Sequence, residues 1–235
     1  RPCTRPGCPA RDGSSWSRPS RCAMARSPCT TGARLRPHGI LGPYVKANVW
    51  SPLFDLAGNS MKAAFESERL LFRELLPSDV EGMFELDSDP QVVRYTGDRP
   101  LTHRDQSRQT IEIIRQQYQD FGIGRWAAVL KETRQFIGWA GLKYIKELNG
   151  RQDNYDLGYR FLRRHWGKGY GTESAKAFVS YGFNEMQLTR ISAYADVEHT
   201  ASIKILEKSG LRFTNTFTDE GDLCAWYEIV ASTVT

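Results

Sequence analysis

The ten residues from Arg164 to Glu173 carry the strongest chemical signal in the chain, because three of five consecutive positions are glycine. Gly167, Gly169 and Gly171 let the backbone curl so that successive N–H groups point into one concavity. A helix is predicted to begin there, and unpaired amides at the positive end of a helix dipole bind anions. The spacing matches neither the Walker A sequence nor the dinucleotide fingerprint. The segment predicts an anion-binding loop, and a glycine-rich turn without a ligand is the alternative.

Two predicted elements must hold this loop: a strand over residues 155–162, and a helix that begins at Lys168 or Thr172 and ends at Phe183. Hydrophobic periodicity together with Gly, Pro and Asp breaks predicts the other elements. These are strands over 68–75, 126–130, 136–142, 190–196, 211–218 and 223–230, and helices from Ser78 or Asp79 to 86, from Thr102 or Asp105 to 121, and over 199–208. The order β-αα-βββ-α-β-α-ββ is an α+β arrangement in which helices flank a mixed sheet, with one strand-helix-strand crossover at its centre.

Composition and charge exclude several classes of protein. The 235 residues are 40% hydrophobic with a mean hydropathy of −0.51, and no apolar run approaches the roughly 18 residues that span a bilayer. We therefore expect no membrane partner and a cytoplasmic location. Residues 1–60 hold nine basic and two acidic residues, which leaves 23 basic and 25 acidic ones in the remainder. Because the remainder is nearly neutral, no nucleic-acid partner is expected.

Residues 1–60 also differ in composition, being rich in Arg, Pro, Ser, Gly and Cys. Such a segment buries too little apolar surface to offset the entropy lost on ordering. Because periodic sequence begins just after Met61, we expect a disordered or non-native leader over 1–60 and one folded domain over 61–235. An organellar transit peptide and an Arg-rich arm for nucleic acid are the alternatives. Four of the five cysteines lie in the leader at spacings that fit no zinc site, so no metal is expected.

At the glycine-rich loop the sequence resembles the GNAT acetyltransferase superfamily. Arg164, Gly167 and Gly169 match its signature [RQ]-x-x-G-x-[GA], and the run 166–173 is similar to the RimJ/RimL branch, which acetylates protein N-termini and small amines. Supporting matches, in chain order, are Arg69 to Leu75 with Asp79, Ile137-Gly138, Leu157-Gly158-Tyr159, and Ala201-Ser202 to Glu207-Lys208-Ser209-Gly210. The resemblance covers residues 61 to about 230 and implies a mixed, mostly antiparallel sheet of about seven strands flanked by about four helices.

The resemblance also implies that acetyl-CoA is the co-substrate. Its pyrophosphate would lie on the loop amides and its pantetheine arm would pair with the strand backbone at 160–162. The central strands of the family splay apart near a bulge, which leaves a free amide that can polarise the acetyl carbonyl. The residues expected to contact acetyl-CoA are Arg160, Phe161, Leu162, Arg164, Trp166, Gly167, Lys168, Gly169, Tyr170, Gly171, Thr172, His199 and Ser202.

The expected chemistry is direct attack by an amine, which must lose a proton, while the departing thiolate must gain one. Asp156 lies where many relatives carry a Glu that acts as base, and a solvated edge-strand carboxylate is the alternative. The Tyr that often serves as acid is Leu206 here, so the resemblance implies Ser202 instead; a helix hydroxyl bonded back to a carbonyl is its alternative. His199 replaces the family's usual Asn near CoA, and His165 is expected to face solvent.

The acceptor is expected to be a primary amine: a peptide N-terminus, a polyamine or an antibiotic. The first two helices and a loop near 146–153 would build its site. The alternative function is a catalytically silent acyl-CoA-binding regulatory module, which the residues Leu206 and His199 motivate. A monomer or a homodimer is compatible with the sequence. Trp126, Trp139, Tyr144 and Trp226 are expected to lie in the core or to line the acceptor pocket, and Cys224 is expected to be buried.

Overall fold

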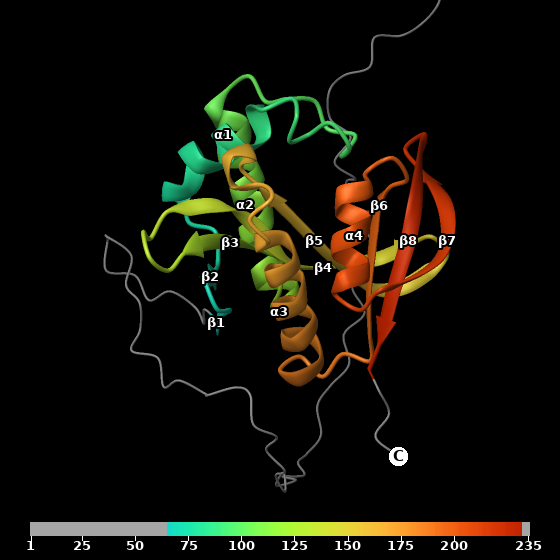
Figure 1. Cartoon of the computed structure of the whole chain (residues 1–235). Coiled ribbons are helices and arrows are strands. Elements are labelled where there is room, and N and C mark those ends of the chain that lie inside the picture. Colours follow the sequence, from blue (N-terminus) through green and yellow to red (C-terminus); the bar gives the residue numbers. More distant parts are fainter. Residues whose placement is uncertain (1–64, 232–235) are drawn as a thin grey trace, which may run out of the picture. The chain divides into compact units, whose positions relative to one another are not determined.

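The computed structural model describes residues 65–231, and its elements follow the predicted order (Figure 1). The helices are α1 (Val80–Ser88), α2 (Arg104–Phe121), α3 (Tyr170–Asn184) and α4 (Thr200–Lys208), with short 3-10 turns at Pro77–Asp79 and Arg163–His165. The strands are β1 (Phe65–Glu66), β2 (Leu70–Arg73), β3 (Arg125–Leu130), β4 (Phe136–Leu148), β5 (Arg151–Phe161), β6 (Arg190–Asp196), β7 (Arg212–Asp219) and β8 (Asp222–Val230). The predicted leader over 1–60 and its boundary at Met61 lie outside the described residues.

The strands form one sheet in the order β1-β2-β3-β4-β5-β6-β8-β7. All neighbours are antiparallel except β5 and β6, which are parallel and are joined through α3. The α+β class and the mixed, mostly antiparallel sheet with four helices are thus confirmed. The sheet has eight strands where about seven were expected, because the two-residue β1 pairs with β2.

The connection expected as a polar loop over 146–153 is a long hairpin instead. β4 and β5 run on to a tight turn at Asn149 and Gly150, whose φ angles are 52° and 67°. Two consecutive residues with positive φ match the twist of an antiparallel pair, so the strands continue to the turn. The prediction of a loop over 146–153 was therefore wrong, because only Asn149 and Gly150 lie between the two strands.

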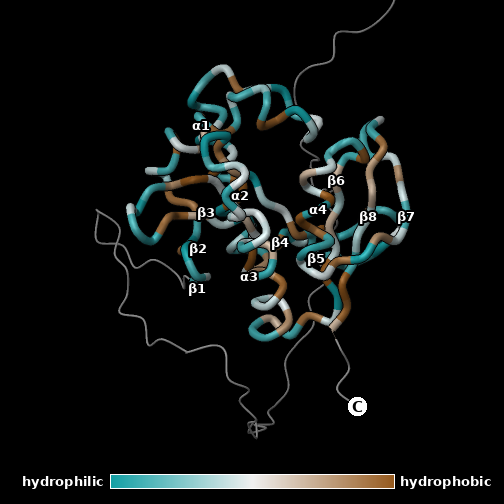
Figure 2. The backbone as a smooth tube through the Cα atoms, viewed as in Figure 1, coloured by the Kyte–Doolittle hydropathy of each residue, from teal (hydrophilic) through white to brown (hydrophobic). Residues whose placement is uncertain are grey.

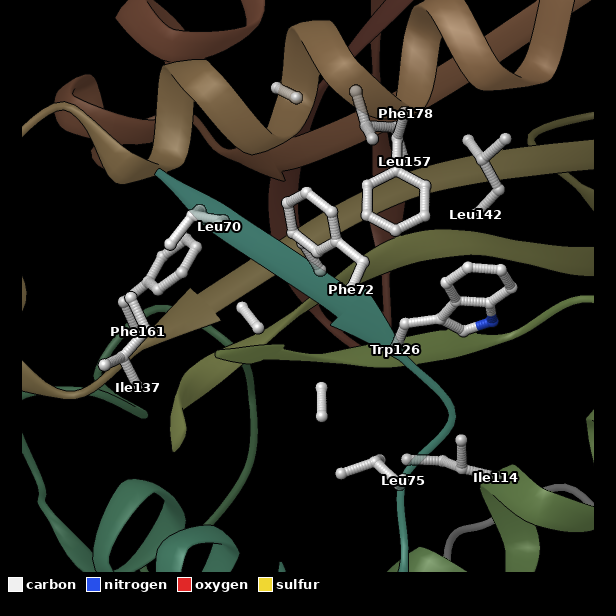
Figure 3. Close-up of a cluster of buried hydrophobic side chains, with 14 of the residues drawn as sticks. Leu70, Phe72, Leu75, Ile114, Trp126, Ile137, Leu142, Leu157, Phe161 and Phe178 are labelled. Carbon is white, nitrogen blue, oxygen red and sulfur yellow. The ribbon is translucent and has the colours of Figure 1, made fainter. Parts of the chain in front are cut away.

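The core lies between the sheet and its helices. Figure 2 shows the apolar stretches gathered in the central strands, with hydrophilic residues in the α1–α2 connection. Phe178 of α3 packs on Phe72 of β2 with ring centroids 5.0 Å apart, and Figure 3 shows Trp126 of β3 beside them. Trp126 and Trp226 are 4% and 0% exposed. Both are therefore core residues and do not line a pocket, and Cys224 is buried as expected.

The sheet opens at its centre. Within the described residues, the parallel ladder between β5 and β6 has one facing pair, Asp156 and Ser192. Beyond it β5 leads away from β6 (Figure 1). The register between β4 and β5 is continuous from Gly138–Phe161 to Ile145–Asn154, whereas the register of β3 against β4 shifts between Ala128 and Val129. One edge of β5 is therefore left without a strand partner.

No helix among residues 65–231 is both long and apolar enough to cross a membrane.

Candidate functional site

The glycine-rich loop presents a run of unpaired amides at the start of α3. Gly167 and Gly169 have φ angles of 71° and 83°, a region in which side chains other than glycine are strained. Among the described residues, the N–H groups of 167–169 donate to no backbone carbonyl, and the first bond of α3 runs from Glu173 N–H to Gly169 O. The amides of Tyr170, Gly171 and Thr172 are those a first helical turn leaves free. Six consecutive N–H groups are therefore available to an anion.

A clamp from the β1–β2 connection holds this loop. Arg69 donates from Nη1 to Lys168 O at 3.0 Å, and its guanidinium pairs with Glu173 at 2.7 Å and lies 4.5 Å from the Tyr170 ring centroid. Ser67 Oγ and the Arg69 N–H also donate to Glu173, at 2.6 and 2.7 Å. Burial alone would raise the pKa of Glu173, but these hydrogen bonds lower it below its ordinary value. The N-terminus of α3 is thus fixed through its first turn.

The loop side chains do not all point where the sequence suggested. Arg164 is exposed and pairs with Glu85 of α1. Trp166 is 48% exposed and its indole N–H donates to Phe161 O at 2.7 Å, which closes the loop onto the end of β5. The expectation that His165 faces solvent was wrong: it is 7% exposed, because the 3-10 turn folds its ring inward beside Tyr170. Burial, followed by Lys168 and Arg164, lowers the pKa of His165.

The free edge of β5 continues from this loop. The Leu162 N–H, just after the end of β5, donates to Ile137 O of β4 at 2.9 Å. Because backbone groups alternate in direction along an antiparallel strand, those of Leu162 and Arg160 point to β4, and those of Phe161 and Tyr159 point to the opening. Of the three residues 160–162 expected to pair with pantetheine, only Phe161 turns its amide toward the opening; Tyr159 joins it.

Helix α4 faces the same opening with Ser202. The Tyr159 hydroxyl lies 3.1 Å from both Ser202 Oγ and Ser202 O. Burial raises the pKa of Tyr159, so the phenol stays protonated. Leu206, at the position of the family's usual Tyr, is 1% exposed and belongs to the core. The sequence analysis missed Tyr159, although it lies in the quoted Leu157-Gly158-Tyr159 run, because no spacing rule joins a strand residue to a helix 43 residues away.

His199 immediately precedes α4 and touches a distant connection. Its ring stacks on Tyr95 of the α1–α2 connection, with centroids 4.6 Å apart and planes 18° apart. Burial lowers the pKa of His199. The stack brings the α1–α2 connection to the start of α4, beside the opening of the sheet.

Asp156 lies at the point where the strands separate, but it is not a solvated edge carboxylate. It is 4% exposed and forms an ion pair with Arg125 of β3. Arg125 Nη1 also donates to Asp156 O at 2.7 Å and to Gly141 O at 2.6 Å. Burial raises the pKa of Asp156 above its ordinary value, and Arg125 opposes that rise.

A second arginine, Arg160 of β5, lies on the same face of the sheet as Arg125 and is largely shielded from solvent. Arg160 pairs with Asp87 of α1 at 2.7 Å and with Asp98 of the α1–α2 connection at 2.9 Å. The Trp139 ring centroid lies 5.3 Å from both the Arg160 and the Arg125 guanidinium carbons, so the indole is bracketed by two cations. The side chain of Arg160 therefore serves the α1–α2 side of the sheet, and only its backbone belongs to the strand edge expected to hold pantetheine.

The same face carries Lys143, opposite Asp156 in the β4–β5 register. Asp219 is the last residue of β7, Asp222 is the first residue of β8, and Asp196 is the last residue of β6. These three carboxylates and burial raise the pKa of Cys224 to about 11, with burial as the larger cause. The α1–α2 side of the opening is therefore built from charged side chains.

Comparison with known proteins agrees with this geometry. The family model of the acetyltransferase (GNAT) domain matches residues 69–212. The chain belongs to the GNAT acetyltransferase family, is an N-acetyltransferase, and has the acetyl-CoA-dependent acetyl transfer to an amine that defines the family. Its sequence is 36% identical over 151 residues to p20, an uncharacterised N-acetyltransferase of Bacillus licheniformis, covering 62% of this chain and 83% of that protein.

Solved structures extend the comparison. A GNAT acetyltransferase from Bacillus anthracis is 26% identical and superposes with a TM-score of 0.59, covering 72% of this chain and 98% of that one. RimL in complex with coenzyme A superposes with a TM-score of 0.61 at 15% identity, covering 72% and 98%. The spermidine N-acetyltransferase of Vibrio cholerae, solved with CoA and spermine, gives 0.57 at 18% identity, covering 69% and 95%. The last two likenesses show the fold alone, and the RimJ/RimL branch stays a prediction.

Proposed function

We propose that this chain transfers the acetyl group of acetyl-CoA to a cationic primary amine by direct attack, without a covalent enzyme intermediate. The observation that carries the proposal is the run of six free amides at 167–172, placed where the unpaired edge of β5 ends. Two phosphates need several donors at once, and consecutive backbone N–H groups at a helix N-terminus supply them. The amide of Phe161 and the backbone groups of Tyr159 would hold the pantetheine arm.

Asp156 is the proposed base. It lies at the last facing pair before the strands separate, and its ion pair with Arg125 opposes the rise in its pKa that burial causes. The carboxylate accepts a proton from the ammonium form of the acceptor, directly or through a water. The neutral amine then attacks the acetyl carbon, the C–S bond breaks and CoA leaves as thiolate.

Ser202 is the proposed donor to that thiolate, with Tyr159 behind it. Either hydroxyl can donate in the Tyr159–Ser202 Oγ contact; when Tyr159 donates its one proton to Ser202 Oγ, the Ser202 hydroxyl proton is free to point to the leaving sulfur. Leu206 has no polar side-chain atom and cannot donate a proton to the thiolate. His199 would approach CoA from the start of α4.

The acceptor is proposed to be a small polycationic amine, with peptide N-termini and aminoglycosides as the competing classes. Within residues 65–231, five carboxylates at the end of β6, in its connection to α4 and at the β7–β8 turn form no ion pair with a basic side chain. They are Asp196, Glu198, Asp219, Glu220 and Asp222. Unpaired carboxylates attract cations. The spermidine N-acetyltransferase of Vibrio cholerae, a protein of the same fold, supports this choice.

The test is release of free thiol from acetyl-CoA with panels of polyamines, N-terminal peptides and aminoglycosides. Polyamine-dependent release, reduced by Ser202→Ala, is expected. Release with peptides alone would contradict the acceptor assignment. The silent module is the second candidate, because Leu206 and His199 depart from the family pattern; it predicts that CoA raises the melting temperature while no acceptor gives release.

A further inference from the structure

Lys143 is an amine that the proposed mechanism does not use, and it lies beside the proposed base. Its β4 position faces Asp156 of β5 in an antiparallel register. Side chains of directly opposed residues lie on the same face of a sheet, with their Cβ atoms about 5 Å apart. Asp156 is also the residue of β5 at which the strands separate. Lys143 therefore lies on the acceptor side of the opening.

The charge of Lys143 is poorly compensated. The side chain is half-buried, and no carboxylate in the described part of the chain lies within ion-pair distance of it, because Arg125 takes the Asp156 carboxylate. Burial lowers the pKa of Lys143, and the nearby Arg125 lowers it further, against smaller effects of Asp156, Asp219 and Asp98. A larger share of its amine is thus neutral and nucleophilic than on an exposed lysine.

We propose that Lys143 is a self-acetylation site, which takes the acetyl group from acetyl-CoA bound to the same chain when no acceptor is present. The inference rests on the proposed function, since acetyl-CoA must occupy the opening of the sheet. The Lys143 ammonium loses one proton to Asp156 or to water, and its nitrogen attacks the acetyl carbon. The C–S bond breaks, the thiolate gains a proton, and the nitrogen loses a second proton as the amide forms.

Lys146 provides an internal control for uncatalysed acetylation. It lies three residues along β4, so it points to the opposite face of the sheet, and it is exposed. Acetyl-CoA in solution modifies exposed, flexible amines without help from a protein. Uncatalysed reaction therefore favours Lys146, whereas reaction within the site favours Lys143.

The experiment incubates the whole chain with acetyl-CoA and no acceptor, followed by trypsin digestion and mass spectrometry. Trypsin cuts after Arg134, Lys143 and Lys146, and acetylation of Lys143 blocks the middle cut, which leaves the intact peptide 135–146. We expect this peptide to accumulate with one acetyl group on Lys143, several-fold faster than acetylation of Lys146. In the chain unfolded with urea, the preference for Lys143 should disappear. Asp156→Asn should slow acetylation of Lys143 and leave that of Lys146 unchanged.

Two negative results are distinguishable. If thiol is released with an amine acceptor while Lys143 stays unmodified, or is modified no faster than Lys146, self-acetylation is wrong and the proposed function stands. If coenzyme A fails to raise the melting temperature and no acceptor gives thiol release, the proposed function is wrong and self-acetylation falls with it.

Discussion

The two sides of the opened sheet differ in the groups that they offer to a ligand. On the cofactor side, between β5 and α3, the groups available to a ligand are backbone amides at 167–172 and on the free edge of β5. On the acceptor side, the surface is made of ion pairs and charged side chains, among them Arg125–Asp156 and Arg160–Asp87. A ligand common to a family can be held by backbone that needs only glycine, whereas a ligand that varies is selected by side chains.

The largest effect is expected from Asp156→Asn, on the acceptor side. Loss of a general base lowers kcat by about 10²- to 10⁴-fold, while CoA binding on the other side stays intact. Steady-state rates from thiol release and calorimetric CoA titration measure the two sides separately. Asp153→Asn, an exposed carboxylate of the same strand, is the control. A variant with the parent's kcat would assign the proton to another group.

Arg125→Gln tests the acceptor side through the pH dependence of kcat/KM. Burial raises the pKa of Asp156 and Arg125 lowers it, so removing Arg125 leaves burial opposed only by the smaller effect of Lys143. Because the base acts as carboxylate, the acidic limb of the kcat/KM profile should move to higher pH. Loss of one partner of a buried pair should also cost about 3–5 kcal/mol of unfolding free energy.

Arg104→Gln is the matched control for that substitution, because its ion pair with Glu81 is exposed. Exposed pairs contribute about 0–1 kcal/mol. An acidic limb that stays in place in Arg125→Gln would show that Asp156 does not set it.

On the cofactor side, a pair of glycine substitutions should distinguish the cost of backbone strain from a loss of CoA binding, and both effects are expected to be smaller. Gly167 and Gly150 have φ angles of 71° and 67°, and a Cβ would meet no atom within 4 Å at either position. Substitution by Ala should cost each variant about 1–2 kcal/mol of stability. Only Gly167→Ala, in the loop, should also weaken CoA binding, by about tenfold. Equal CoA affinity in the two variants, measured by calorimetry, would argue against the loop as the phosphate site.

The smallest effect is expected from Tyr159→Phe, which removes one hydrogen bond to Ser202, worth about 0.5–1.5 kcal/mol. We expect a several-fold fall in kcat with little change in the KM for acetyl-CoA, because the hydroxyl contacts the proposed donor and not the loop. Tyr144→Phe, on the exposed part of β4, should leave both constants unchanged. If Tyr159→Phe lowers kcat as much in a Ser202→Ala background as in the parent, the Tyr159 hydroxyl does not act through Ser202, which would contradict this role.

The contrast between the sides also explains what sequence could predict. Glycine spacing, strand patterns and helix breaks are local signals, and they placed the loop, the strand before it and the order of all the larger elements. Arg125–Asp156 and Arg160–Asp87 join residues 31 and 73 positions apart, and only the paired sheet and the packing of α1 bring them together. His165 was misplaced for a related reason, since its burial depends on a 3-10 turn that no local pattern marks.

The most direct test of the central claim compares coenzyme A with pantetheine, which lacks the pyrophosphate, in amide chemical-shift titrations of this chain. The amides of 167–172 should move with coenzyme A and not with pantetheine, whereas those of Tyr159 and Phe161 should move with both. Loop amides that stay still with coenzyme A, or that move equally with pantetheine, would contradict the assignment of the backbone loop as the pyrophosphate site.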